Sequence, residues 1–317
     1  MAHGALCFLC PGLWISGEEI AAQMGVSRAA VWKQVRALRA SGYRIESSPR
    51  RGYRLLEADR LDPERIRSGL QTKFLGRELH YFREVESTND VSRSLAESCP
   101  DGTVVLAEVQ TRGRGRLARS WASPPGGIWM SVVLKPALPL SRAYRANMAV
   151  SLAVAKALSR LYQLRAAIKW PNDILIGGRK ISGILMEVRA ELDRLDYVIA
   201  GVGLNVNIDP SRFPAEWNAT SISDQLGHDV SRTELVQEIL REIEEAYLKL
   251  GSEEIFEEWR SLSATTGRYV RISSLEGDFE GEAVSLGEDG SLCIKTENGL
   301  QRVLAGDCLH LRGREEA

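Results

Sequence analysis

The sequence contains few cysteines and no apolar run of the length, about 18 residues, that a membrane-spanning helix needs. Its five cysteines are odd in number and scattered, so reduced thiols are expected rather than a disulfide framework. Cys7 and Cys10 form a single C-x-x-C with no second pair, which supports neither a zinc site nor a redox site. The N-terminus lacks the charged start and cleavage site of a signal peptide. These absences predict a cytoplasmic protein that does not enter a membrane.

Neither sign of charge predominates, since the chain has 41 Lys and Arg and 42 Asp and Glu, which gives a formal net charge of −1. Any basic surface must therefore be local. A Walker A loop is absent as well. "GVGLN" (Gly201 to Asn205) is only part of a G-x-G-x-x-G pattern and has no clear helix after it, so a dinucleotide-binding fold is not expected. A chain of 317 residues predicts two or three domains.

Residues 1–60 show the pattern of a winged helix-turn-helix. Ser16 and Glu19 form a capping box that begins a short helix, and Gly25 ends this helix. Ser27 caps a second helix, whose apolar positions are Val31, Val35 and Leu38. Two alternating stretches follow Gly42, on either side of "SPRRG", and predict a β-hairpin wing. In place of a usual first helix, "ALCFLCPGLWIS" contains Pro11 and Gly12.

Basic residues are concentrated in this N-terminal domain. Between Ser27 and Arg54 the sequence is rich in Lys and Arg, and Glu46 is its only acid. A basic helix together with a basic wing tip can neutralise several DNA phosphates at once. The plainer alternative is a solvated basic helix of an interaction domain. The candidate DNA-binding residues are Ser27, Arg28, Lys33, Arg36 and Arg51.

Residues 61–265 alternate strand and helix patterns, and these are mixed with hairpins, which predicts an α/β or α+β domain on a mixed sheet. Strands are expected over 78–85, 102–109, 126–136 and 195–208, and a hairpin is expected to turn at Gly177-Gly178. Helices are expected over 89–97 and 143–164, with a charged helical segment over 234–261. Residues 266–317 contain five short alternating runs. Asp289-Gly290 and Asn298-Gly299 mark hairpin turns among them, so a small SH3-like barrel is predicted.

Residues 110–121, here called the arginine loop, read "QTRGRGRLARSW". Glycine lets backbone N–H groups approach an anion, and arginine supplies paired donors to a phosphate or carboxylate. The loop is short, single and mid-domain, which disfavours an RGG-type nucleic-acid tail. We expect it to be mobile until an anionic ligand binds. The role of Arg112 is not assigned.

Two lysines are expected to converge with this loop. Lys169 begins "KWPND", and Lys180 lies on the returning strand of the predicted hairpin. Together with Arg114 and Arg116 they would form a strongly positive pocket suited to a polyphosphate in a transfer reaction. The plainer alternative for "KWPND" is an ordinary strand end with a packed Trp170.

Five motifs occur in order: "ESTND", "QTRGRGR…W", "KWPND", "RKISGILMEV" and "GVGLNVN". Taken together they resemble the biotin–protein ligases, and with the winged helix they resemble the bifunctional ligase and biotin operon repressor. The resemblance extends over nearly the whole chain. It implies an α+β multidomain protein: a winged helix-turn-helix, a class II synthetase-like ligase domain and an SH3-like C-terminal domain, with the boundaries 1–60, 61–265 and 266–317.

The resemblance also implies the reaction and its partners. The biotin carboxylate attacks the α-phosphate of Mg-ATP to give biotinyl-5′-AMP and pyrophosphate. A lysine of a biotin carboxyl carrier protein, a subunit of acetyl-CoA carboxylase, then takes the biotin and releases AMP. Biotin, ATP and Mg²⁺ are thus implied, with no metal ligand assigned. Operator DNA is an implied partner of a homodimer for which biotin is the co-repressor.

Residue roles are carried over motif by motif. The implied biotin-binding residues are Ser87, Thr88, Asn89, Gln110, Arg114, Gly115, Arg116 and Lys180. The implied ATP- or adenylate-binding residues are Trp121, Lys169, Asn172 and Asn205. The residues expected to act in catalysis are Arg116, Lys169 and Lys180.

Two alternative functions are weighed beside this one. The first is a transcription regulator whose α/β domain senses a ligand without ligase activity. The second is a lipoate–protein ligase, which shares the fold but lacks the GRGR-type loop and the winged helix.

Overall fold

The computed structural model describes residues 4–5, 8–9, 13–40, 45–55, 61–274 and 277–311. It divides into two compact units, Met1–Arg60 and Leu61–Ala317, which are treated separately below. The C-x-x-C cysteines Cys7 and Cys10 and the turn at Gly42 lie outside the described residues.

The first unit contains the predicted helix-turn-helix and hairpin. Its elements are β1 (Trp14–Ile15), α1 (Gly17–Met24), α2 (Arg28–Ala40), β2 (Ile45–Ser48) and β3 (Gly52–Leu55). Ser16 accepts a hydrogen bond from the Glu19 backbone, and Gly25 ends α1 in the left-handed conformation, as expected. The short strand β1 was not expected; it pairs with β3 at the edge of the three-stranded sheet β1-β3-β2.

The second unit is built on a seven-stranded sheet of order β4-β5-β6-β10-β9-β8-β7. Its strands are β4 (Leu79–Val85), β5 (Thr103–Gln110), β6 (Ile128–Leu134), β7 (Ala166–Lys169), β8 (Asp173–Ile176), β9 (Arg179–Glu191) and β10 (Arg194–Leu204). Strands β4 and β5 are parallel and the other neighbours are antiparallel. The predicted mixed sheet is therefore confirmed, including the hairpin that turns at Gly177-Gly178.

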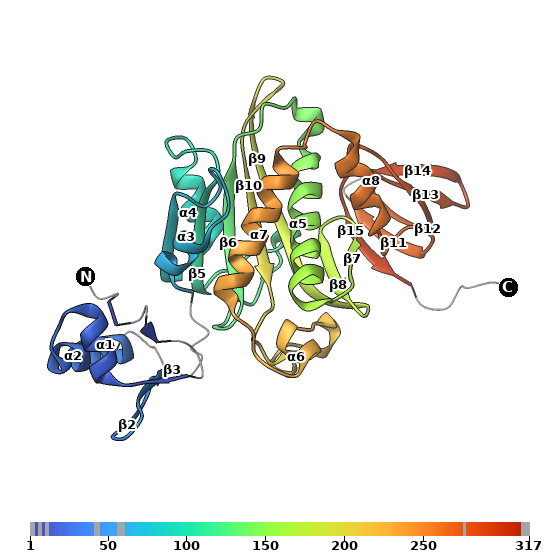
Figure 1. Cartoon of the computed structure of the whole chain (residues 1–317). Helices are drawn as coiled ribbons and strands as arrows, with labels where there is room; N and C mark the ends of the chain where they lie inside the picture. Colours follow the sequence, from blue (N-terminus) through green and yellow to red (C-terminus); the bar gives the residue numbers. More distant parts are fainter. Residues whose placement is uncertain are drawn as a thin grey trace. The chain divides into compact units, whose positions relative to one another are not determined.

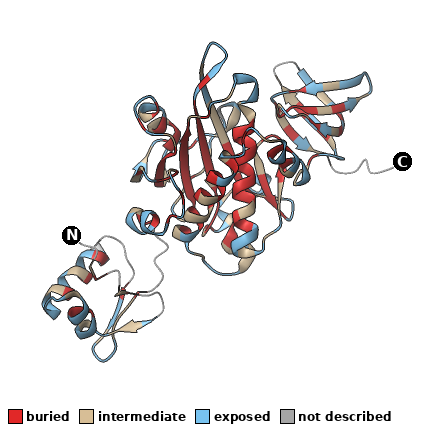
Figure 2. Ribbon diagram, turned by 45° about the horizontal axis from the view of Figure 1, so that its top comes forward, coloured by how far each residue is buried: buried red, intermediate tan, exposed pale blue. Residues whose placement is uncertain are grey.

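Helices α5 and α7 lie side by side against one face of this sheet (Figure 1). The helices of the unit are α3 (Pro63–Gly69), α4 (Thr88–Leu95), α5 (Tyr144–Tyr162), α6 (Ile222–Leu226), α7 (Arg232–Tyr247) and α8 (Glu253–Ser261). Most of α5 and of the central strands is buried (Figure 2). The charged helical segment expected over 234–261 is in fact two helices, because the chain leaves helical geometry between Tyr247 and Glu253.

Strand β10 determines what each face of the sheet can hold. Its residues Val198, Ala200 and Val202 belong to the core shared with α5 and α7. Side chains alternate between the two faces of a strand, so Gly201 and Gly203 face the opposite side. Because glycine has no side chain, this side of the sheet is left open for other groups.

The C-terminal strands form a five-stranded antiparallel sheet of order β14-β13-β12-β11-β15. They are β11 (Tyr269–Ser274), β12 (Gly277–Leu286), β13 (Leu292–Thr296), β14 (Gly299–Val303) and β15 (Asp307–His310). Gly290 and Gly299 have φ angles of 83° and 108°, which the predicted turns require of glycine. The strand pairing ends at β14 and β15, so closure into a barrel stays a prediction. Over the part of the chain described, every helix is too short or too polar to cross a bilayer.

Candidate active site

A cavity of about 1120 Å³ opens on the side of the sheet that Gly201 and Gly203 face. Strands β8, β9 and β10, the arginine loop and the start of α4 line it, together with segments of the C-terminal sheet. It brings together all the residues that the sequence assigned to biotin or ATP: Ser87, Thr88, Asn89, Gln110, Arg114, Gly115, Arg116, Trp121, Lys169, Asn172, Lys180 and Asn205.

A network of polar side chains joins three lining residues, Thr88, Asn89 and Gln110, to Ser123 and Ser131. Thr88 donates from its backbone N and its hydroxyl to Gln110 Oε1, at 2.8 and 3.1 Å. Ser131 donates to Asn89 Oδ1 at 2.6 Å, and the amide of Gln110 donates to Ser123 Oγ at 2.8 Å. Sequence reasoning missed Ser131, because nothing local separates it from the other buried residues of β6. The arrangement offers short, oriented donors and acceptors to a small polar ligand.

Glycines allow these groups to approach the sheet. A Cβ on Gly201 would lie 2.3 Å from Asn89 Oδ1. The Trp121 ring lies against Gly203 and its cross-strand partner Gly183, where added Cβ atoms would meet it at 2.6 and 3.0 Å. The glycines of "GVGLN" therefore make room for Asn89 and Trp121, which explains this pattern without a dinucleotide fold.

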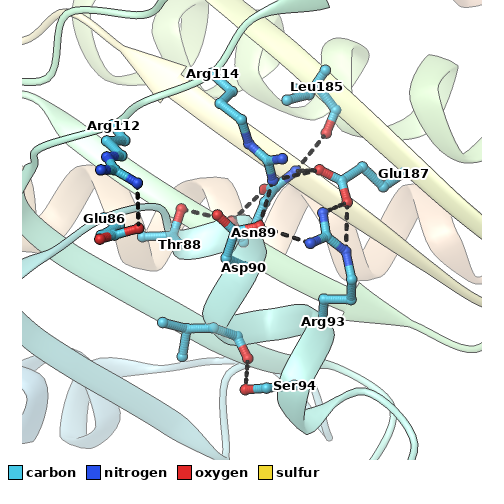
Figure 3. Close-up of polar contacts among 12 residues, drawn as sticks. Glu86, Thr88, Asn89, Asp90, Arg93, Ser94, Arg112, Arg114, Leu185 and Glu187 are labelled. Atoms are coloured by element: carbon cyan, nitrogen blue, oxygen red, sulfur yellow. Dashed lines mark hydrogen bonds and ion pairs between the residues drawn. The ribbon is translucent and has the colours of Figure 1, made fainter. Parts of the chain in front are cut away.

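Three of the loop arginines are paired with carboxylates. Arg112 contacts Glu86 at 3.4 Å, and Arg114 contacts Asp90 at 2.6 Å and Glu187 at 3.1 Å (Figure 3). Arg119 contacts both carboxylate oxygens of Asp307, at 3.0 and 2.6 Å. The sequence did not foresee these acidic partners, which come from α4, β9, β15 and, for Glu86, the segment between β4 and α4.

Arg116 differs from the other three. Its Nη1 donates to Asn172 Oδ1 at 3.4 Å, and among the described residues no carboxylate lies within ion-pair distance of it. Burial lowers the pKa of Arg116, because removal from water disfavours the charged guanidinium. Arg116 is therefore the loop cation whose charge is left for an anionic ligand.

Glu187 connects three elements through one carboxylate (Figure 3). Its Oε1 accepts from Asn89 on α4 and from Arg114 in the loop, each at 3.1 Å. Its Oε2 accepts from Arg93 Nε at 3.1 Å. Burial opposes its ionisation, but the hydrogen bonds from Arg93 and Asn89 outweigh burial and lower the pKa of Glu187.

The arginine loop also makes backbone hydrogen bonds of its own. Trp121 N donates to Gly113 O at 2.8 Å, and Gly115 N donates to Arg119 O at 2.7 Å. A Cβ on Gly113 would lie 2.3 Å from Trp121 O, so this glycine permits close packing of the loop on itself. Ordering of the loop by a ligand remains a prediction.

The lysines lie on neighbouring strands, as the hairpin requires. Lys180 Nζ is 2.8 Å from Asp173 Oδ1 and 5.1 Å from the centroid of the Trp121 ring. Lys169, at the end of β7, has no ion-pair partner among the residues the structure covers. The cavity is thus less strongly positive than predicted, since Asp173 and Asp307 also line it.

"KWPND" is held from two sides. Tyr144 and Asn147 of α5 both donate to the carbonyl of Pro171, Asn147 at 3.0 Å. Trp170 Nε1 donates to the carbonyl of Gly290 in the C-terminal sheet at 2.8 Å. Burial raises the pKa of Tyr144, so its hydroxyl remains protonated and can donate. Trp170 is packed, as the plainer reading had it, and the motif also lines the cavity.

Asn205 and the segment 213–219 complete the lining. Asn205 is buried and its amide donates to Thr220 O at 3.0 Å, so part of its hydrogen-bonding capacity is used within the protein. Phe213 and Trp217 stack with centroids 5.8 Å apart. Sequence reasoning missed this pair, although two aromatics in a polar loop were a usable signal.

The candidate DNA-binding residues lie in the first unit. Arg28, Lys33, Arg36 and Arg51 are exposed, and Ser27 Oγ accepts from Ala30 N at 3.2 Å at the start of α2. Trp32 is 51% exposed, and the Arg36 guanidinium lies 5.5 Å from its ring centroid. Sequence reasoning did not select Trp32, whose exposure became apparent only with the helix in place.

Sequence models of known families match three parts of the chain. Residues 11–54 match an HTH domain, residues 81–205 the biotin/lipoate A/B protein ligase family, and residues 265–311 the biotin protein ligase C-terminal domain. The last match favours the biotin branch over the lipoate branch.

Whole-chain comparisons agree. A bifunctional ligase/repressor BirA of Bacillus subtilis is 38% identical over 93% of each chain. A biotin–[acetyl-CoA-carboxylase] ligase of Mycobacterium tuberculosis is 32% identical over 81% of this chain and 100% of its own. A solved biotin protein ligase of Aquifex aeolicus, in complex with biotin and ATP, is 30% identical with a TM-score of 0.64, over 75% of this chain and 100% of its own. The chain therefore belongs to the biotin–protein ligase family, in the form that carries an N-terminal helix-turn-helix domain.

Proposed function

We propose that this protein is an ATP-dependent biotin–protein ligase and a biotin-dependent transcriptional repressor. It forms biotinyl-5′-AMP and transfers biotin to a lysine of a biotin carboxyl carrier protein of acetyl-CoA carboxylase. One observation carries the ligase half: a single cavity holds buried polar side chains, two lysines, Trp121, and an Arg116 that has no carboxylate partner within the described part of the chain. A sensor of biotin alone would need a cation only for the single carboxylate of its ligand, whereas this cavity gathers several cations.

The roles proposed for the residues follow from their positions. Ser87, Thr88, Asn89 and Gln110 hold the ureido ring of biotin, where each unpaired buried polar group would cost about 1–3 kcal/mol. Arg114 and Gly115 shape the loop above it, and Trp121 stacks on adenine. Lys169 and Asn172 bind the phosphates, and Asn205 lies near the nucleotide.

Arg116 and Lys180 act at the reacting centre. A carboxylate attacking a phosphate brings two anions together, so fixed cations must offset their repulsion in the transition state. The arginine loop then shields the mixed anhydride from water until the carrier lysine attacks its acyl carbon. Pyrophosphate leaves in the first step and AMP in the second.

Mg²⁺ is proposed to enter with ATP. Within the described part of the chain no group of three or more His, Cys, Asp or Glu could hold a metal. Asp173 and Asp307 line the cavity, and each is already in an ion pair. This fits a cation carried mainly by phosphate oxygens, as Mg²⁺ usually is at nucleotide sites.

The direct test uses the full chain with biotin, ATP and a biotin carrier domain. The expected result is pyrophosphate release and a biotinylated lysine on the carrier, detected by mass spectrometry. A ligand sensor would bind biotin and leave the carrier unmodified. Lipoate offered in competition should not be incorporated.

Gly201→Ala is expected to weaken biotin binding by at least about tenfold, because the added Cβ would displace Asn89 and break its bond to Ser131. Isothermal titration calorimetry with biotin measures the effect. Gly251→Ala is the control, since no atom lies within 4 Å of a Cβ at that position. Equal affinities for the two variants would refute the proposed place of Asn89.

For the repressor half, we propose that α2 enters the major groove and that the wing contacts the phosphates. One small winged helix reads only one half-site, so a homodimer on operator DNA is also proposed. Biotin and ATP together should tighten DNA binding in a gel-shift assay. Equal binding with and without them would contradict co-repression.

Lys33→Ala is expected to weaken DNA binding and to make the slope of log K against log salt shallower by about one, because one phosphate contact is lost. Fluorescence anisotropy at several salt concentrations measures the slope. Arg260→Ala, which removes a cation of α8 paired with Glu257, is the control. An unchanged slope for Lys33→Ala would place α2 away from DNA.

We further propose the domain boundaries 1–60, 61–265 and 266–317, closure of the C-terminal sheet into an SH3-like barrel, and a cytoplasmic location. The matched family segments 11–54, 81–205 and 265–311 fit these boundaries. The cytoplasm supplies the ATP that the reaction needs.

A further inference from the structure

The arginine loop is attached to the rest of the second unit at both of its ends. Arg114 is held by Asp90 and Glu187 at one end (Figure 3), and Arg119 is held by Asp307 at the other. Arg116 lies between these two anchors and is bound to no carboxylate among the described residues. The anchors therefore hold the loop down on either side of Arg116, while the hydrogen bond to Asn172 holds the guanidinium itself.

The second anchor comes from the C-terminal sheet. Asp307 begins β15, and its cross-strand partner on β11 is Ser273. The next residue, Cys308, is buried in a core that also contains Trp170 of "KWPND". The strand that carries Asp307 therefore packs in the same core as Trp170, which lines the cavity.

Buried contacts join this sheet firmly to the central domain. Arg145 of α5 is 1% exposed and contacts Glu288, in the turn between β12 and β13, at 3.1 Å. Trp170 donates to Gly290 O, in the turn between β12 and β13, at 2.8 Å, and its ring shares a core with Val270 and Ile272 of β11. Such contacts hold the sheet in one place, so Asp307 is a fixed point for the loop.

The contact between Arg119 and Asp307 is of a different kind. Their side chains are 64% and 42% exposed, and an exposed ion pair is weak and easily broken. Its two parallel hydrogen bonds nevertheless fix the direction of the guanidinium. A weak, directional contact suits a loop that must open for substrates and close over the intermediate.

We propose that Asp307 is a positioning residue of the ligase reaction: through Arg119 it holds the arginine loop closed over the adenylate. This inference rests on the proposed ligase function. Asp307 contacts neither reacting group and acts only through the loop. It makes the C-terminal sheet responsible for how long biotinyl-5′-AMP is retained and protected from water.

The test is Asp307→Asn in the full chain. With biotin and ATP but no carrier protein, the adenylate should be lost about two- to fivefold faster, the effect expected for one exposed ion pair. The KM for biotin should rise by a similar factor, while kcat for pyrophosphate release stays unchanged. A chase with unlabelled biotin after loading with labelled biotin measures the loss.

Two further variants make the test specific. Glu280→Gln breaks the exposed pair Arg271–Glu280 of the same sheet, in which the side chains are 50% and 42% exposed, and does not reach the loop. It should retain the adenylate as the wild type does. The double reversal Arg119→Asp with Asp307→Arg should restore retention that either reversal alone loses, which a merely structural role would not produce.

The inference would be overturned if Asp307→Asn lost the adenylate no faster than Glu280→Gln does. It would also be overturned if the double reversal did not restore retention of the adenylate. Either result would leave the ligase function standing. A wild-type chain that releases no pyrophosphate would instead refute the proposed function itself.

Discussion

Arg116→Gln is expected to slow adenylate formation by about 10²–10³-fold, the usual effect of removing one preorganised group that stabilises transition-state charge. Arg116 is the arginine of the loop whose charge no described carboxylate neutralises, and it donates to Asn172 at 3.4 Å. Biotin-dependent pyrophosphate release measures the rate. The melting temperature of the variant should be unchanged or slightly higher than that of the wild type, because burial disfavours the charged form of this guanidinium.

Two variants of the same loop sharpen this result. Arg112→Gln removes a charge that is paired with Glu86 and 76% exposed, so it should retain wild-type turnover. Arg114→Gln should raise the KM for biotin more than it lowers kcat, because Asp90 and Glu187 already neutralise Arg114. If Arg116→Gln lost no more activity than Arg112→Gln, Arg116 would not act at the reacting centre.

Lys180→Met should have a comparable effect, about 10²–10³-fold on pyrophosphate release. The methionine keeps the apolar stem and loses the ammonium group, which lies 2.8 Å from Asp173 Oδ1 and over the Trp121 ring. Its loss has two consequences. One cation is missing where carboxylate and phosphate meet, and the freed Asp173 carboxylate adds a negative charge beside the same anions.

The neighbouring Arg179 is the matched control for Lys180. It pairs with Asp224 at 2.8 Å and does not line the cavity. Arg179→Met should therefore release pyrophosphate at the wild-type rate, and Asp173→Asn combined with Lys180→Met should recover part of the lost activity. Equal rates for Arg179→Met and Lys180→Met would exclude a role for Lys180 in the chemical step.

Much of the local structure could be predicted because its signals are local. The cap at Ser16, the left-handed stop at Gly25 and the hairpin turns at Gly290 and Gly299 each depend on one or two residues. The cavity residues could be predicted because each of them lies in a short motif that is recognisable in the sequence. Contacts between distant segments have no such signal, so the pairing of Trp14–Ile15 with the wing was missed.

The charge of the site shows this limit most clearly. Sequence composition marked the arginines of residues 110–121, but their partners Asp90, Glu187 and Asp307 are ordinary acids in distant segments. The pocket that was predicted to be cationic therefore contains charges of both signs. Carboxylates neutralise the other loop arginines, so Arg116 is the one whose charge can act on a bound anion. Only three-dimensional proximity can distinguish a neutralised arginine from a free one.

By itself the sequence determined which elements form, the order of the motifs and the chemical types gathered for the reaction, because capping, alternation and turn chemistry act over a few residues. The tertiary structure alone decided which loop arginine has no carboxylate partner among the described residues, why Gly201 and Gly203 must lack side chains, and that the C-terminal sheet supplies Asp307 to the loop. Ion pairing and close packing depend on distances between atoms, and only the folded chain brings those atoms together.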